Sequence, residues 1–218
     1  MTDQTFKRFK EFIEGTLGIK IPPAKKVMLE SRFAKRVRTL GMESLEEYCD
    51  YVFSPEGYDL EIQQLMDAVT TNETSFFRES HHFDYLEKSV LPEYANQGLK
   101  DINIWSVAAS TGQEAYTLAM VMEEFMSRTG YRFNYRILGT DISETVLHIA
   151  NTGIYTEHQA SKIPPVLQRR YCRKNRDPEQ KTIRIIPALR DRVVFGKMNL
   201  MNETYPLGKQ YHIVFCRN

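Results

Sequence analysis

The order of predicted segments after residue 100 constrains the fold of this chain more than any other feature. Short apolar runs of strand character alternate with amphipathic helical runs, and two more strand-like runs follow. Alternation of strand and helix is typical of a parallel sheet with helices packed on its faces, so we predict an α/β domain. Its strands are expected within 101–109, 135–141, 192–199 and 211–216, and its helices within 110–130 and 143–153.

Polar and glycine residues mark the ends of these two helices. Ser110 and Gln113 have the spacing of a capping box, and Gly130 follows the first helix. Ser143 is the expected N-cap of the second helix.

The connection at 154–191 is too long for a simple loop. It is rich in Pro, Arg and Lys and contains the β-like run TIRII at 182–186. We expect a small inserted hairpin or a three-stranded lobe.

The first 70 residues have a helical period instead. Apolar residues recur at steps of three and four, and Gly18 and Gly41 follow two of the stripes. Ser44 and Glu47 have capping-box spacing before a third helix. A small helical bundle is the natural packing for such stripes. The stripes are Phe6, Phe9, Ile13 and Leu17; Leu29, Phe33, Val37 and Leu40; Tyr48 and Val52; and Leu65, Met66 and Val69.

Composition excludes several classes of protein. The 29 Lys and Arg residues nearly balance 28 Asp and Glu, so overall charge does not predict a nucleic-acid or membrane-surface partner. Cys49, Cys172 and Cys216 are far apart and form no C-x-x-C pair, which argues against a disulfide framework and against structural zinc. We therefore expect that the protein holds no metal and that it works in the reducing cytoplasm. Neither a signal peptide nor an 18-residue apolar run is present.

Two features fall at the carboxyl edge of the predicted sheet, where open parallel sheets bind ligands. The turn 108–114 offers small residues and Gly112, which would let backbone amides approach a ligand. Asp141 ends the second strand and could accept hydrogen bonds from a ribose diol. Each has a plainer explanation, because turn glycines are common and a strand-ending aspartate often caps a helix.

The kind of ligand can be narrowed. The G-x-G-x-x-G motif is absent, and Asp141 lies 29 residues beyond Gly112 rather than about 20. A bound pyrophosphate is therefore disfavoured. A nucleoside without phosphate, of which S-adenosylmethionine is the common example, suits the edge better.

Five motifs in order carry a resemblance to a known family: TTNETSFFRE at 70–79, WSVAASTGQEAYTLAM, ILGTDIS, GKMNLM and the final IVFCRN. Together they resemble the chemotaxis receptor methyltransferases of the CheR type, which transfer methyl from S-adenosylmethionine to glutamate side chains of chemoreceptors. The resemblance implies a helical domain at 1–70, an inter-domain segment at 71–80, and a Rossmann-like methyltransferase domain at 81–218 with a β-subdomain insert near 154–191.

The resemblance also implies roles for individual residues. Asn72, Thr74 and Arg78 would project into the cofactor site, with Arg78 and Thr74 as the catalytic pair, while Phe76 and Phe77 anchor the segment. For Arg78 the plainer alternative is a surface ion pair with Glu79 or another neighbour, which would contribute little to stability. The remaining cofactor-binding residues would be Ala108 and Glu114 at the methionine end, Asp141 at the ribose with Ile142 beside it, and Asn199, Leu200, Arg217 and Asn218 at the adenosine side or floor.

The implied partner is the acid-rich helical cytoplasmic part of a chemoreceptor; other chemotaxis signalling proteins are further candidates. Arg32, Lys35 and Arg38 point away from the apolar stripe of their helix, so we expect this basic face to dock there. A merely solvated surface is the alternative. Some family members hold a receptor's C-terminal pentapeptide with the insert, but the loop 174–180 lacks glycine, which argues against that contact.

The histidine pair, the final strand and the choice of function are three further features on which the sequence bears. His81 and His82 are assigned to a helix face rather than to a metal. The family's sheet continues past the last motif, so this sheet is expected to stop at its fourth strand, with either a longer chain or another chain covering the edge. The functional alternatives are a non-catalytic cofactor- or receptor-binding relic and, less favoured, a nicotinamide oxidoreductase.

Overall fold

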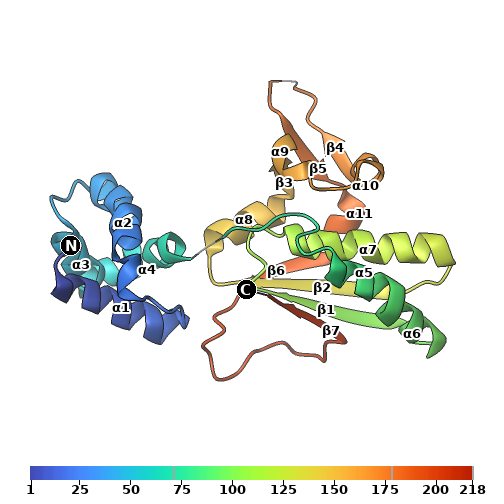
Figure 1. Ribbon diagram of the computed structural model, residues 1–218, viewed down its shortest axis with the longest axis horizontal. Coiled ribbons are helices and arrows are strands. Elements are labelled where there is room, and N and C mark those ends of the chain that lie inside the picture. The colour runs from blue at the N-terminus through green and yellow to red at the C-terminus, as the bar shows by residue number, and fades with distance from the viewer. Residues whose placement is uncertain (71, 178, 218) are drawn as a thin grey trace. The chain divides into compact units, whose positions relative to one another are not determined.

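The computed structural model describes residues 1–70, 72–177 and 179–217 (Figure 1). These residues divide into two compact units. The first unit holds the helices before residue 70 together with 142–144 and 199–205, and the second holds 72–141, 145–198 and the residues from 206 onward.

The first unit is built from helices whose apolar stripes were predicted. Their buried side chains, among them Phe9, Phe33, Tyr48 and Leu65, form one hydrophobic core. Gly18 and Gly41 end two helices in the left-handed conformation that glycine adopts at no steric cost. The elements are α1 (Asp3–Leu17), the 3₁₀ turn η1 (Pro23–Lys25), α2 (Lys26–Leu40), α3 (Leu45–Val52) and α4 (Pro55–Val69).

One capping prediction in this unit is half correct. The Ser44 side chain accepts a hydrogen bond from the Glu47 amide at 3.0 Å. The Glu47 carboxylate, however, accepts from the amide of Glu43 at 2.8 Å, one residue before the position that a capping box requires.

A buried ion pair crosses the helical core. The Arg36 guanidinium donates to both carboxylate oxygens of Glu61, at 2.6 and 2.9 Å, and the Tyr48 hydroxyl donates to the same carboxylate at 3.1 Å. The Glu61 side chain is only 4% exposed. Burial, followed by the neighbouring Glu61 charge, raises the pKa of Tyr48, so its hydroxyl remains a donor at neutral pH.

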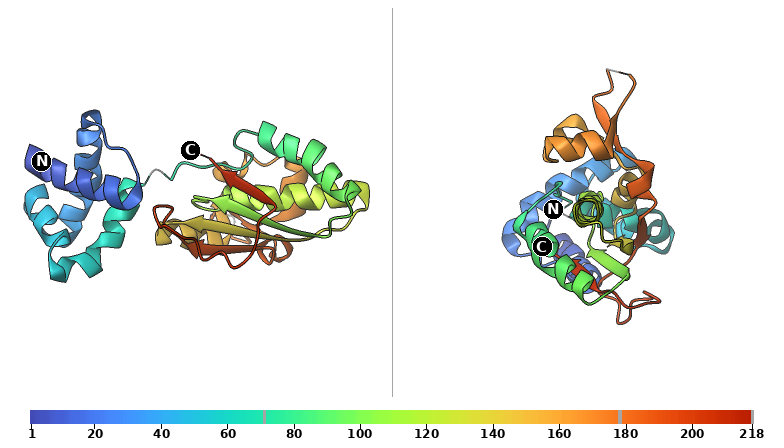
Figure 2. Two further views of the ribbon diagram at one scale, coloured as in Figure 1. Left: turned by 90° about the horizontal axis from the view of Figure 1, so that it is seen from below. Right: turned by 90° about the vertical axis from the view of Figure 1, so that its right-hand side faces the viewer.

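The second unit contains a parallel sheet in the order β6-β2-β1-β7, which confirms the predicted α/β class (Figure 1). Figure 1 and the left view of Figure 2 show α7 running along this sheet, and most of its side chains are buried. Within the described residues β6 and β7 form the two edges. The elements are β1 (Asp101–Val107), α7 (Gln113–Thr129), β2 (Asn134–Asp141), α8 (Glu144–Thr152), β6 (Val193–Lys197) and β7 (Ile213–Cys216).

Further helices precede β1. They are α5 (His81–Tyr85), the π-helical turn η2 (Leu86–Val90) and α6 (Leu91–Asn96). His81 and His82 lie on α5, as expected. Phe83, Leu86 and Leu91 bury their side chains in the same core as the sheet.

The long connection forms the three-stranded alternative of the two that were predicted. Its antiparallel sheet has the order β3-β5-β4, and it makes a separate lobe in Figure 1. Its elements are β3 (Ile154–Thr156), α9 (Glu157–Ala160), α10 (Pro165–Tyr171), β4 (Cys172–Lys174), β5 (Thr182–Ile185) and α11 (Pro187–Arg190).

The start of α7 differs from the prediction. Its N-cap is Gly112 with no side-chain cap, so the Ser110–Gln113 capping box is wrong. Ser110 bonds elsewhere, and the Gln113 side chain accepts from the Thr111 hydroxyl at 2.6 Å. The C-terminal prediction is confirmed, because Gly130 ends α7 in the left-handed conformation.

Gly112 is required for packing. A Cβ there would lie 2.8 Å from the Ala150 Cβ and 2.9 Å from the ring of Phe195, closer than such atoms approach. The missing side chain therefore makes room for α8 and β6, a packing role that the sequence did not predict for this glycine.

Among the helices that the structure describes, none is both long enough and apolar enough to span a membrane.

We expect Glu61→Ala to lower the free energy of unfolding of the helical unit by about 3 kcal/mol, because it leaves the Arg36 charge and the Tyr48 hydroxyl without their buried partner. Urea unfolding followed by far-UV circular dichroism measures this. The matched control is Glu11→Ala, which removes the exposed Lys7–Glu11 pair and should cost under about 1 kcal/mol. Equal losses in the two variants would contradict the prediction.

We expect Gly112→Ala to destabilise the second unit by about 3 kcal/mol, because the methyl group meets Ala150 and Phe195 in addition to the left-handed backbone. Gly130→Ala is the control: its φ is also positive, at 75°, but nothing lies within 4 Å of its Cβ, so about 1 kcal/mol is expected. The fluorescence of Trp105, the single tryptophan, reports the transition.

Candidate functional site

The turn between β1 and α7 has a strained backbone. Ala108 and Ser110 adopt positive φ angles of 52° and 50°, and Gly112 follows at 87°. Left-handed conformations cost energy in residues other than glycine and persist where the surrounding structure holds them, often at ligand sites. The hydroxyl of Tyr155, on β3, donates to the Thr111 carbonyl at 2.7 Å and helps to hold this turn. Burial raises the pKa of Tyr155 well above its usual value, so it remains a donor.

Asp141 lies beside this turn. Its carboxylate accepts a hydrogen bond from the Ser110 amide at 2.8 Å, and its side chain is buried. The parallel pairing of β1 with β2 ends at Val107 and Thr140, which brings the two predicted features together. The carbonyl of Asp141 also accepts from the Met198 amide at 2.9 Å, so the stretch after β6 starts at the same edge.

Residues 72–79 form a crossing segment that reaches this edge of the sheet. The Ser110 hydroxyl donates to the Asn72 carbonyl at 3.0 Å, so Asn72 contacts the turn directly. Thr74 and Arg78 are half-buried. The Arg78 guanidinium donates to the Glu73 carbonyl at 2.8 Å. Glu79, the first partner named in the ion-pair alternative for Arg78, pairs with Arg217 instead.

The two phenylalanines hold the segment on the second unit, as predicted. Phe76 is 1% exposed and packs edge-on against Tyr155, with ring centroids 4.9 Å apart. Phe77 packs on Phe83, and its amide donates to the Thr117 hydroxyl at 3.3 Å.

Glu114, in the first turn of α7, is held by two partners. Ser106, buried in β1, donates its hydroxyl to one carboxylate oxygen at 2.7 Å, and Arg217 Nε donates to the other at 2.6 Å. Arg217 follows β7, so Glu114 joins β1, α7 and the end of β7.

Not all predicted residues fall in this unit. Ile142, Asn199 and Leu200 group with the helical unit, where the Asn199 side chain donates to the Thr16 carbonyl at 2.8 Å. Asn218 lies outside the described residues.

The predicted basic face of α2 has members in different states. Lys35 and Arg38 are exposed. Arg32 instead donates to the carbonyls of Ala68, Val69 and Thr70 at 3.0 to 3.2 Å, at the C-terminal end of α4. Its cation satisfies carbonyls that a helix end leaves unpaired.

Sequence reasoning missed Ser106, Tyr155 and Glu79. Ser106 is a lone hydroxyl in an apolar strand, which is a signal of a buried hydrogen bond. Tyr155 looks like any core aromatic in sequence, and Glu79 looks like a partner for its neighbour Arg78. Only the fold shows what they contact.

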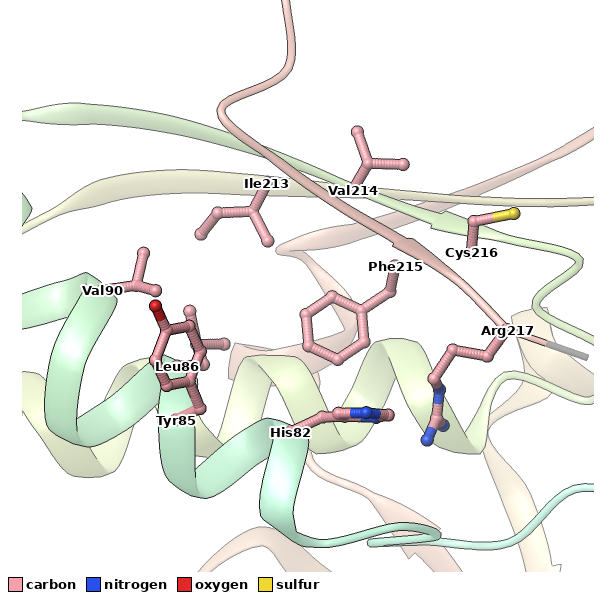
Figure 3. Close-up of a pocket in the computed structure, with 9 residues that line it drawn as sticks. All are labelled: His82, Tyr85, Leu86, Val90, Ile213, Val214, Phe215, Cys216 and Arg217. Atoms are coloured by element: carbon pink, nitrogen blue, oxygen red, sulfur yellow. The ribbon is translucent and has the colours of Figure 1, made fainter.

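An apolar groove of about 330 Å³ lies at edge strand β7, next to the network of Ser106, Glu114 and Arg217 (Figure 3). Ile213 and Phe215 point toward the α5 side chains, whereas Val214 and Cys216 point away (Figure 3). Arg217 is the site residue that the groove shares with the network. The lining residues are His82, Tyr85, Leu86, Val90, Ile213, Val214, Phe215, Cys216 and Arg217.

The cysteines do not form a reactive cluster. Burial raises the pKa of Cys49 and of Cys172 to about 11 each, so both thiols are protonated at neutral pH. Cys216 is exposed. Across 1–70, 72–177 and 179–217, no three His, Cys, Asp or Glu side chains are grouped as metal ligands would be.

Comparison with known proteins assigns both parts of the chain. Residues 4–70 match the family model of the CheR methyltransferase all-alpha domain, and residues 72–218 match that of the CheR methyltransferase SAM binding domain. The match to the second model includes the β1–α7 turn, Asp141 and the crossing segment.

Named relatives match over nearly the whole chain. A chemotaxis protein methyltransferase of Borreliella burgdorferi is 34% identical over 100% of this chain and 77% of its own length. The Escherichia coli protein of that name is 30% identical over 100% and 73%, and chemotaxis protein methyltransferase 1 of Pseudomonas aeruginosa is 36% identical over 98% and 77%. This chain therefore belongs to the CheR family of S-adenosylmethionine-dependent methyltransferases.

Proposed function

We propose that this enzyme transfers a methyl group from S-adenosylmethionine to glutamate side chains of chemoreceptors and thereby forms glutamate methyl esters for sensory adaptation. The observation that carries the proposal is the double role of Ser110. Its amide binds Asp141 and its hydroxyl binds the Asn72 carbonyl, so the edge of the sheet and the crossing segment meet at one residue.

The predicted site residues would contact different parts of the cofactor. Asp141 and Ile142 would hold the ribose, and Ala108 and Glu114 the methionine end. Asn72, Thr74 and Arg78 would project into the cofactor site from the crossing segment. The floor and the adenosine side would be formed by Asn199, Leu200, Arg217 and Asn218. S-adenosylhomocysteine would remain after transfer.

The residues present fit a cofactor with one cationic and one anionic end. Each Glu114 oxygen accepts one hydrogen bond, from Ser106 or from Arg217, and a carboxylate oxygen can accept a second, which suits an ammonium group. Arg78 has, among the described residues, only a carbonyl as partner of its guanidinium, so its charge is available to a carboxylate.

The chemistry needs alignment more than proton transfer. A glutamate side chain has a reference pKa of about 4.3 and is already a carboxylate at neutral pH, so no general base is required. One of its oxygens forms a bond to the methyl carbon while the bond from that carbon to sulfur breaks. The carboxylate and sulfonium charges cancel, which a desolvated site favours over water. Correct alignment can supply about 7 to 11 kcal/mol.

The domains divide this work. We propose that the helical domain at 1–70 docks the receptor, that 71–80 lines the site, and that 81–218, with its insert at 154–191, binds the cofactor. The receptor part concerned is the cytoplasmic helical region, so the reaction would take place in the cytoplasm. The exposed Lys35 and Arg38 are the docking residues that the structure supports most directly, because Arg32 is engaged at the end of α4.

We expect Arg78→Ala to reduce methyl transfer by about a thousandfold with the fold intact, because the cation that would align a carboxylate is lost. Radiolabelled methyl transfer to a receptor fragment, scored as base-labile ester, measures this. Arg128→Ala is the matched control, since it removes an arginine that pairs with Glu87 on the surface. Near-normal turnover by Arg78→Ala would refute the assignment.

We expect Lys35→Glu combined with Arg38→Glu to slow receptor methylation about tenfold at low salt, because the reversed charges repel an acid-rich receptor. High salt should abolish the difference, and the KM for S-adenosylmethionine should not change. Reversal of Lys7, an exposed lysine on α1, serves as the control. A double variant with the rate and salt dependence of the native protein would show that this face is only solvated.

A further inference from the structure

Arg217 is the centre of a network that reaches the crossing segment. Its guanidinium donates to the Glu79 carboxylate and to the Arg78 carbonyl, both at 2.9 Å, in addition to its bond with Glu114. The side chain is only 13% exposed. It lies 5.6 Å from the Phe83 ring centroid and 6.0 Å from that of Phe215, so aromatic faces fix its position.

The two residues that flank Arg78 both have a strained backbone. Phe77 and Glu79, on either side of it, both have φ angles of 53°. Residues with side chains adopt this conformation only where neighbouring contacts hold it. At Phe77 these contacts are its ring packing on Phe83 and the hydrogen bond from its amide to Thr117. At Glu79 they are the two hydrogen bonds that Arg217 donates, one to the Arg78 carbonyl and one to the Glu79 carboxylate.

This geometry separates two charges that are adjacent in sequence. The Arg78 guanidinium turns back to the Glu73 carbonyl, while the Glu79 carboxylate is taken by Arg217. His82 Nδ1 lies farther from that carboxylate, at 3.8 Å. Glu79 therefore does not neutralise Arg78.

We propose that Glu79 is a positioning residue of the cofactor site. It holds Arg217 between the crossing segment and Glu114, fixes the left-handed turn at 77–79, and leaves the charge of Arg78 unneutralised for a ligand carboxylate. Ser106 fixes the opposite end of the same chain of contacts. The inference rests on the proposed function, because the ligand that gains is S-adenosylmethionine or its product.

The test compares Glu79→Gln with the native chain in two measurements. Calorimetry with S-adenosylhomocysteine should show binding weakened about tenfold, because Arg217 loses its charged partner on the segment. Amide hydrogen exchange of the ligand-free protein should be faster at 76–80. Glu87→Gln is the matched control: its pair with Arg128 has the same 2.9 Å distance, and neither measurement should change.

Two further variants separate the carboxylate from the backbone. Glu79→Gly tolerates a positive φ but lacks the carboxylate, so it should weaken binding as Glu79→Gln does. In an Arg217→Ala background, Glu79→Gln should have less than about a twofold effect, because Glu79 acts through Arg217.

The outcomes are distinct. Native binding by Glu79→Gly, or unchanged binding and exchange in Glu79→Gln, overturns the proposal. If the native chain binds no S-adenosylhomocysteine, the proposed cofactor fails. In that case the role of Glu79 in fixing the turn is judged by exchange alone, and unaltered exchange in Glu79→Gln rejects it.

Discussion

The hydrogen bond from the Ser110 amide to the Asp141 carboxylate depends on the parallel pairing of β1 and β2, and the arrangement of the site depends on that bond. Parallel strands end at a common edge, so residues 31 positions apart come within hydrogen-bonding distance. The left-handed turn after β1 aims the Ser110 amide at the carboxylate while its hydroxyl reaches Asn72. One strained residue thus joins two strands and the crossing segment.

The pairing of charged side chains in this region does not follow their order in the sequence. The side chains of Glu79, Arg217 and Glu114 lie along one connected path, to which Arg78 adds only its backbone carbonyl. Where the backbone is left-handed at 77 and 79, the Glu79 carboxylate pairs with Arg217 and not with its neighbour Arg78. A cation and a carboxylate in one site, the roles proposed for Arg78 and Glu114, suit a zwitterionic amino-acid end, which is what a methyl donor derived from methionine presents.

Much of the fold could be predicted because its signals are local. The stripe from Phe6 to Leu17 with Gly18 after it predicts α1, and the apolar run after Asp101 predicts β1. The family motifs indicated candidate site residues, which periodicity and turn chemistry alone do not distinguish from other polar residues. The local rules failed where tertiary contacts competed for a side chain: Ser110 has good capping spacing, yet its hydroxyl bonds to Asn72, and Arg32 lies on a basic face, yet it caps α4.

Sequence alone determined the helical first part, the order of strands and helices, and the residue types at the carboxyl edge, because periodicity and turn chemistry act over a few residues. Only the tertiary structure decided which partner each polar group has. In the fold, Glu79 pairs with Arg217 and Glu114 accepts from Ser106. Ala150 and Phe195 fill the space beside Gly112. Such contacts join residues far apart in the chain, and their choice depends on strand register and backbone direction, which no local pattern encodes.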